Sequence, residues 1–318
     1  MTHLAEITYP IIDPVLLDFG TIKVRWYGVC YIVAFALAAL VLRDLSKRGR
    51  FPVPADKVID VLFWGILGVF IGGRLGYFLF YGLSLGYEWW QIVEVWKGGM
   101  SFHGGLLGVI VAYWLYCWKN GLARGEFFDG LSLATAPGVA VVRFGNFINA
   151  ELWGRTWDGA LAMRFPRYND FVLHLPLNLR DKFTPDSTGW FKAREAGEKA
   201  GITEDMLFEP ARHPSQLYEM FTEGVILYFV LRFLMLRLGW GGGRIAACFL
   251  IGYGAMRFLV ENFREPDKGI GFQLGTWLTR GQLLCIGMML AGVIVWLLCK
   301  PYPPKGAAAG ETAEPPAA

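Results

Sequence analysis

Charged residues are scarce in this sequence. Asp, Glu, Lys and Arg make up 18% of its 318 residues, against about a quarter in soluble domains. The net charge of +3 is too small to indicate a nucleic-acid partner. Hydrophobic residues reach 54% and the mean hydropathy is +0.38. The composition therefore predicts an integral membrane protein.

Motifs for metal and redox chemistry are also missing. The four histidines show no HExxH or HxxxH spacing, and the five cysteines show no CxxC spacing. We therefore expect no metal site. The cysteines lie in or beside predicted spans and should pack as small hydrophobic residues; they are Cys30, Cys117, Cys248, Cys285 and Cys299.

The long apolar stretches predict an all-α polytopic membrane protein. Each span needs about 20 mostly apolar residues, and the first 20 residues do not resemble a cleavable signal peptide. Glycines four apart, Gly68, Gly72 and Gly76 in the second span and Gly104 and Gly108 in the third, predict close helix packing. We expect about seven transmembrane helices, at roughly 26–42, 58–80, 102–118, 128–149, 214–235, 244–263 and 280–299.

The distribution of basic residues predicts the orientation. Loops after the first, third, fifth and seventh spans are richer in Lys and Arg than the short loops opposite, so they should face the cytoplasm. The N-terminus should then be periplasmic and the C-terminus cytoplasmic. Residues 150–213 are too polar to span and hold six large aromatic side chains, which favours a small periplasmic subdomain within a catalytic domain of residues 1–300. The Pro/Ala-rich tail at 301–318 should be disordered.

Unusual polar side chains recur at the outer ends of the predicted spans. An ionisable side chain inside the bilayer costs about 2.5–3.5 kcal/mol on insertion scales, so it normally faces a protein interior or a water-filled cavity. We therefore expect one polar cavity that opens outward. The residues concerned are Tyr27, Arg74, Tyr77, His103, Arg143, Asn146, Asn149, Glu151, Arg257 and Glu261, together with the segment HPSQLYE at 213–219.

The spacing of the arginines indicates an anion site. Arg143 and Asn146 share a helix face, and Arg257 and Glu261 are spaced for an intrahelical salt bridge. Such a bridge could simply neutralise two buried charges, or it could orient a guanidinium toward a ligand. Because arginine binds phosphate bidentately, two arginines near lipid favour an anionic phospholipid head group as the ligand.

Three interpretations of His103 stay open: a general base, a helper for phosphate, or a hydrogen-bonded residue at a helix start. Two other functions also compete with an enzyme. An anion or lipid transporter would favour an inverted repeat and charges along both leaflets, and neither is evident. A non-catalytic scaffold would leave the intramembrane arginines unexplained.

Five motifs resemble the prolipoprotein diacylglyceryl transferase family. They are GGRLGYFLFY at 72–81, GGMSFHGGLLG at 98–108, RFGNFINAELWGR at 143–155, RHPSQLYE at 212–219 and GYGAMRFLVENFREPD at 252–267. The match runs in order from Asp13 to about Trp296. The 143–155 motif is highly specific.

The resemblance implies a seven-helix enzyme of the bacterial inner (cytoplasmic) membrane without metal or cofactor. It would transfer the diacylglyceryl group of phosphatidylglycerol to the thiol of the lipobox cysteine in a prolipoprotein signal peptide, forming a thioether and releasing glycerol phosphate. The acceptor thiol would then be the nucleophile, with His103 or Glu151 as candidate base.

The family's pattern also implies roles for individual positions. Arg143 and Arg257 match its phospholipid-binding arginines, and we place Arg74 beside them as a further lipid-binding candidate. Other matching positions are Tyr27, His103, Asn146, Glu151, Gly154 and Glu261. Ala150 stands where the family often has glycine, a change expected to cost little. The 156–211 loop matches poorly.

Overall fold

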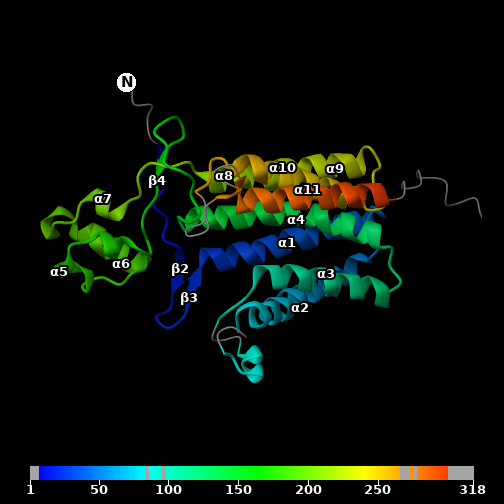
Figure 1. Cartoon of the computed structure of the whole chain (residues 1–318), viewed down its shortest axis with the longest axis horizontal. Coiled ribbons are helices and arrows are strands. Elements are labelled where there is room, and N and C mark those ends of the chain that lie inside the picture. Colours follow the sequence, from blue (N-terminus) through cyan, green and yellow to red (C-terminus); the bar gives the residue numbers. More distant parts are fainter. Residues whose placement is uncertain (1–6, 83–85, 95–97, 266–271, 275–277, 300–318) are drawn as a thin grey trace, which may run out of the picture. The chain divides into compact units, whose positions relative to one another are not determined.

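The computed structural model describes residues 7–82, 86–94, 98–265, 272–274 and 278–299. The 301–318 tail that the sequence predicts to be disordered lies outside these residues. The longer helices are α1 (Trp26–Lys47), α2 (Val58–Tyr77), α3 (Phe102–Lys119), α4 (Arg124–Ile148), α6 (Ser187–Ala196), α9 (Leu227–Leu236), α10 (Arg244–Val260) and α11 (Arg280–Leu298). Figure 1 traces these elements along the chain.

Short elements connect and extend these helices. Single helical turns form α5 (Leu177–Arg180), α7 (Glu204–Leu207) and α8 (Ser215–Glu219). Two π-helical segments, η2 (Phe78–Gly82) and η7 (Met220–Ile226), continue α2 and α8. The strands are β1 (Ile7–Thr8), β2 (Val15–Asp18), β3 (Lys23–Arg25), β4 (Met163–Arg164), β5 (Phe272–Leu274) and β6 (Leu278–Thr279), paired as β1–β4, β2–β3 and β5–β6.

All seven predicted spans fall on helical segments, and four of these helices are long and apolar enough to cross a membrane by length and composition. These four are Trp26–Lys47, Ala55–Gly82, Arg124–Ile148 and Arg280–Leu298. Two of the other three differ from these in length or charge. Helix α10 is shorter, with 17 residues, and the segment from α8 to α9 contains the charged residues Glu219, Glu223 and Arg232. The structure therefore supports a mostly helical, multi-pass membrane protein.

The chain divides into two compact units. The first comprises Met1–Leu37, Thr135–Arg232 and Ala247–Ile294, and the second comprises Ala38–Ala134, Phe233–Ala246 and Val295–Ala318. The division falls inside α1, α4, α9, α10 and α11.

The second unit contains the glycine contact that the sequence predicts. A Cβ on Gly72 would lie 2.4 Å from the carbonyl oxygen of Gly104, and one on Gly76 would lie 2.6 Å from the Cα of Gly104. Glycine is therefore required where α2 meets α3. In the same unit, the buried Asp129 accepts hydrogen bonds from the backbone N–H groups of Gly243 and Ala246, each 2.8 Å long, at the start of α10.

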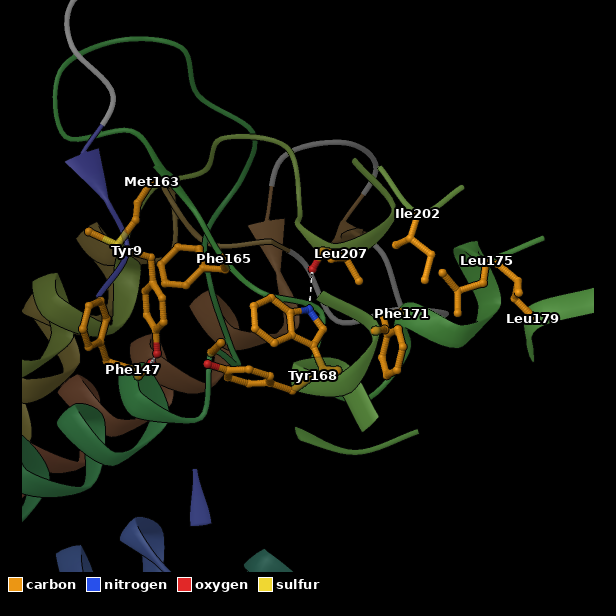
Figure 2. Packing of buried hydrophobic residues seen from close by; sticks show 13 residues of the cluster. Tyr9, Phe147, Met163, Phe165, Tyr168, Phe171, Leu175, Leu179, Ile202 and Leu207 are labelled. Atoms are coloured by element: carbon orange, nitrogen blue, oxygen red, sulfur yellow. Dashed lines mark hydrogen bonds between the residues drawn. The ribbon is translucent and has the colours of Figure 1, made fainter. Parts of the chain in front are cut away.

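In the first unit, the segment between α4 and α8 forms its own hydrophobic core. Trp190, Phe165 and Phe171 are fully buried, and the Trp190 indole donates to the carbonyl of Leu207 at 2.8 Å. Figure 2 shows Tyr9, Phe147 and Phe165 together at one end of this core and Leu175 and Leu179 at the other. The aromatic residues of the predicted 150–213 subdomain thus mostly build a core, although Trp157 is 42% exposed.

Tyr9 joins this core to the end of α4. Its hydroxyl lies 2.8 Å from the carbonyl oxygen of Phe147 and 3.0 Å from that of Ile148. These carbonyls belong to the last turn of α4, where a carbonyl has no N–H donor four residues further along the helix. Burial, together with the nearby Tyr168, raises the pKa of Tyr9, so the hydroxyl keeps its proton as a donor.

Candidate active site

Arg143 meets two glutamates of the α8–η7 segment. Its Nε lies 3.0 Å from Oε2 of Glu219, and its Nη2 lies 3.7 Å from Oε2 of Glu223. Both glutamates are completely buried. These two carboxylates are the counter-charges that a buried arginine needs.

Glu219 also binds two arginines near the end of α10. Its Oε1 lies 3.1 Å from Nη1 of Arg257 and 3.1 Å from Nη1 of Arg264. The predicted pair of Arg257 and Glu261 is confirmed, with Nη2 and Oε2 2.7 Å apart. Glu261 further accepts a hydrogen bond of 2.9 Å from the Thr279 hydroxyl. We call the six ionic residues the Arg/Glu cluster: Arg143, Arg257, Arg264, Glu219, Glu223 and Glu261.

The π-helical segment η7 brings Glu223 to Arg143. Such segments are rare and occur often at functional sites. Gly224, the next residue, packs so tightly on α4 that an added Cβ would lie 2.5 Å from the Cβ of Ala140. Because a larger side chain would push η7 away from α4, Gly224 sets the distance between Glu223 and Arg143.

Exposure differs between the two signs of charge in the cluster. The arginine side chains keep 12–18% of their surface exposed, whereas those of Glu219 and Glu223 keep none and that of Glu261 keeps 7%. The guanidinium groups are therefore the accessible part of the cluster. An anion that approaches it meets N–H donors first, as phosphate binding requires.

Beyond Arg143, α4 ends in a turn that presents Glu151. The backbone N–H of Ala150 bonds to the carbonyl of Phe147, and that of Glu151 bonds to the carbonyl of Asn146 at 3.1 Å. Ala150 has φ = 51° and Leu152 has φ = 58°. This is a Schellman ending with Ala150 at the left-handed position, where glycine is preferred.

Side chains on both sides hold the Glu151 turn. The amide nitrogens of Asn146 and Asn149 donate to Glu151 Oε1 at 2.9 and 3.3 Å. From α8, Gln216 donates to the carbonyl of Glu151 at 2.7 Å, and Ser215 donates to that of Leu152 at 3.0 Å. The turn is thus fixed to α4 and α8, two of the helices that carry the Arg/Glu cluster.

Gly154 is a contact point between three chain segments. Its backbone N–H bonds to the carbonyl of His213 at 2.9 Å, and an added Cβ would lie 2.3 Å from the carbonyl oxygen of Phe263. The next residue, Arg155, donates from its backbone to that same carbonyl at 2.8 Å. Gly154 therefore lets the chain pass close to the segment that carries Arg264.

Tyr27 lies beside this region on α1. Its ring packs on Gly145, where an added Cβ would lie 3.1 Å from Cδ2 of Tyr27. Its hydroxyl is 3.4 Å from that of Tyr31. Tyr31 in turn lies near the charged groups of Glu151 and Arg143. The first unit thus brings together most residues predicted from the sequence: Tyr27, Arg143, Asn146, Glu151, Gly154, Arg257 and Glu261.

Three predicted residues, Arg74, Tyr77 and His103, belong to the second unit. All five N–H donors of Arg74 bond to backbone carbonyls between Gln91 and Gly99, and the residue is 6% exposed. Arg74 therefore has no N–H left for a phosphate in this conformation, and its predicted contact with lipid lacks structural support. His103 is exposed in the first turn of α3, which the Ser101 side chain caps by accepting from Gly104 N.

Sequence reasoning missed Glu223 and Arg264 as site residues, and it included Glu219 only as part of the polar segment that begins the fifth span. Two glutamates four residues apart inside a predicted span were the available signal, since buried carboxylates are as costly as buried arginines. The buried Cys285 on α11, expected from the sequence only as a packing residue, lies near Arg257, Glu261 and Glu223. Within the described residues, no His, Cys, Asp and Glu side chains gather in a group that could hold a metal ion.

Comparisons with known proteins find similar sequences over most of the chain. The family model of prolipoprotein diacylglyceryl transferase matches residues 14–298. A phosphatidylglycerol–prolipoprotein diacylglyceryl transferase of Legionella pneumophila (strain Corby) is 38% identical over 91% of this chain and 98% of the relative. Proteins of the same name from Mesorhizobium japonicum and Photobacterium profundum are 38% and 37% identical and cover 94% and 95% of this chain, and 94% and 98% of their own lengths.

Proposed function

This chain belongs to the prolipoprotein diacylglyceryl transferase family, and from that premise we propose that its Arg/Glu cluster binds the phosphate of phosphatidylglycerol. The chain is a bacterial multi-pass membrane transferase that moves a diacylglyceryl group from phosphatidylglycerol to a prolipoprotein. The roles that we assign to individual residues are proposals.

The acceptor in this proposal is the thiol of the lipobox cysteine in a prolipoprotein signal peptide. Its thiolate sulfur attacks the glycerol carbon that carries the phosphate, a carbon–sulfur bond forms, and the carbon–oxygen bond to phosphate breaks. Glycerol phosphate leaves with the bonding electrons, and a base takes the thiol proton. The enzyme therefore has two tasks, which are to stabilise negative charge on the leaving phosphate and to accept a proton.

The accessible guanidinium groups are the observation that supports the first task. Arg143 and Arg257 come from different helices, yet both bind the carboxylate of Glu219. A side chain held in this way loses little further freedom when it binds a ligand. Planar forks oriented before the substrate arrives suit a phosphate whose charge grows as the bond breaks.

Glu151 and His103 remain the two candidates for the base. For Glu151, both asparagine amides donate to Oε1, so Oε2 is the oxygen left for the thiol. Its turn contains two residues with positive φ, and such backbone conformations cluster at functional sites. For His103, exposure at the start of α3 leaves the imidazole accessible.

We further propose seven membrane crossings, with the N-terminus and the 150–213 subdomain in the periplasm and the C-terminus in the cytoplasm. The bias of basic residues among the short loops supports this orientation. The separate core around Trp190 supports a folded subdomain outside the bilayer.

The decisive experiment incubates the purified full-length enzyme with phosphatidylglycerol and a lipobox peptide and weighs the products by mass spectrometry. We expect the peptide to gain one diacylglyceryl group and glycerol phosphate to appear in equal amount. A peptide in which serine replaces the lipobox cysteine is the control and should stay unmodified. Modification of that control, or no modification of the cysteine peptide, would contradict the proposal.

A further inference from the structure

Glu223 is the most loosely paired carboxylate of the Arg/Glu cluster. Glu219 has arginine contacts of 3.0–3.1 Å, and Glu261 has one of 2.7 Å together with the Thr279 hydroxyl. The salt bridge of Glu223 is the 3.7 Å contact with Arg143. The groups that face Glu223 are Arg143 on α4, Glu219 on α8, Tyr253 and Arg257 on α10, and Cys285 on α11.

The charges of the Arg/Glu cluster cancel before any substrate binds. It contains three arginines and three glutamates, and a lipid phosphate would add one more negative charge. Because Glu219 and Glu223 are completely buried, water screens that excess charge poorly. A fully ionised cluster would therefore oppose the anion it is meant to hold, unless one carboxylate becomes neutral.

We propose that Glu223 takes up a proton when the phosphate of phosphatidylglycerol enters the Arg/Glu cluster. The three guanidinium groups then face two carboxylates and one phosphate, and the charge stays balanced. The proton comes from solvent and returns to it when glycerol phosphate leaves, so no bond of the transfer reaction changes. This inference rests on the proposed phosphate site.

Glu223 can lose its charge at the lowest cost in contacts. Neutralising Glu219 would weaken contacts with all three arginines, and neutralising Glu261 would weaken the close pair with Arg257. A neutral Glu223 gives up one long salt bridge, and its new O–H has the hydroxyl of Tyr253 nearby as an acceptor. Glu223 is thus a proton-binding residue that acts through the arginines.

The experiment measures proton uptake while the full-length enzyme, solubilised in detergent, binds a short-chain phosphatidylglycerol. Titration calorimetry in buffers of different ionisation enthalpy gives the number of protons bound. A phosphodiester keeps its charge across mildly acid to mildly alkaline pH, so any proton binds to the protein. For the wild type we expect close to one proton per lipid, and about a tenfold loss of affinity for each pH unit on the alkaline side.

The variants separate Glu223 from other groups. Glu223→Gln should bind the lipid without proton uptake and with affinity that no longer depends on pH. Glu204→Gln, the same change at an exposed glutamate of the outer subdomain, should behave as the wild type. Equal proton uptake by Glu223→Gln and wild type would overturn the proposal.

The wild-type measurement decides the matter if Glu223→Gln fails to fold, since binding without any proton uptake would overturn the inference by itself. The same titrations also test the underlying site. If Arg143→Lys binds the lipid as tightly as the wild type, the phosphate site is misplaced and the proposed function of the cluster fails. Tight binding that is lost in Arg143→Lys but never linked to a proton refutes only the role of Glu223.

Discussion

Arg143 and the completely buried Glu219 form an ion pair, with Nε and Oε2 3.0 Å apart, between α4 and α8. The same carboxylate reaches Arg257 and Arg264 with its other oxygen. Loss of one partner would leave a buried charge uncompensated, which is strongly destabilising. The pair therefore links two helices and also supports the proposed phosphate site.

The shape of the Arg143 guanidinium should matter more than its charge. Arg143→Lys keeps the positive charge but removes the planar fork, so we expect turnover to fall about a hundredfold or more. Arg164→Lys, at a partly exposed salt bridge of the subdomain, is the control and should keep near-normal activity. Initial rates of peptide lipidation at matched protein levels check this. Normal turnover by Arg143→Lys would remove Arg143 from the phosphate site.

The contact between Gly224 and Ala140 should be essential for placing Glu223. Gly224→Ala forces two methyl groups together, and overpacking of this kind costs about 1–3 kcal/mol. We expect lower thermal stability and lower activity. Adding Ala140→Gly should restore both in part, because it removes one of the atoms that the new methyl group meets, while the backbone Cα and N of residue 140 still lie 2.7 and 2.8 Å from it. A double-mutant cycle measures the coupling, and additive effects would show that the two residues do not meet.

Ala150 should limit stability in the turn before Glu151. An L-residue in the left-handed region costs about 1–2 kcal/mol, so the small cost expected from the sequence is an underestimate at φ = 51°. Ala150→Gly should raise the melting temperature, and Ala150→Val should lower it. Thermal unfolding of the purified variants decides, and a lower melting temperature for the glycine variant would contradict the strained turn.

The chain's own thiols should be dispensable for transfer. Replacing Cys30, Cys117, Cys248, Cys285 and Cys299 by alanine or serine removes small buried groups, so stability should fall. Lipidation of the peptide should persist, because the substrate supplies the nucleophile. The informative single variant is Cys285→Ala, since this thiol lies near the Arg/Glu cluster. A diacylglyceryl adduct on the wild-type enzyme that Cys285→Ala lacks would indicate a covalent intermediate instead.

The orientation can be tested by labelling single cysteines in the cysteine-free background. Leu177 is 78% exposed in the predicted periplasmic subdomain, and Lys119 is exposed at the end of α3. Leu177→Cys should react with an impermeant reagent applied to spheroplasts, and Lys119→Cys only after the membrane is opened. Reaction of Lys119→Cys in closed spheroplasts would reverse the topology.

Local spacing in the sequence predicted the contacts that arise within one helix or between two neighbouring helices. Arg257 and Glu261, four residues apart, form the expected pair, and the glycine rows of α2 and α3 meet as predicted. Both contacts follow from the helical repeat, because residues four apart lie on the same face of a helix.

Contacts between distant segments were beyond this reasoning. Glu223 meets Arg143 from within a π-helical segment, η7, and no residue type indicates where such a segment shifts the helical register. The saturation of Arg74 depends on the path of a loop, which brings five carbonyls to one guanidinium. The sequence showed that these charges needed partners, and only the structure identified the partners.

The site is assembled from segments that leave the ribosome at very different times. Arg143 is synthesised before Glu219, and Glu261 obtains its hydrogen bond from Thr279 only at the start of the last helix. Before Glu219 and Glu223 are synthesised, Arg143 faces an insertion cost of about 2.5–3.5 kcal/mol without its counter-charges. A chain that ends before Glu219 therefore leaves Arg143 without its counter-charges, whereas a chain that ends after Arg264 contains all six charges of the cluster.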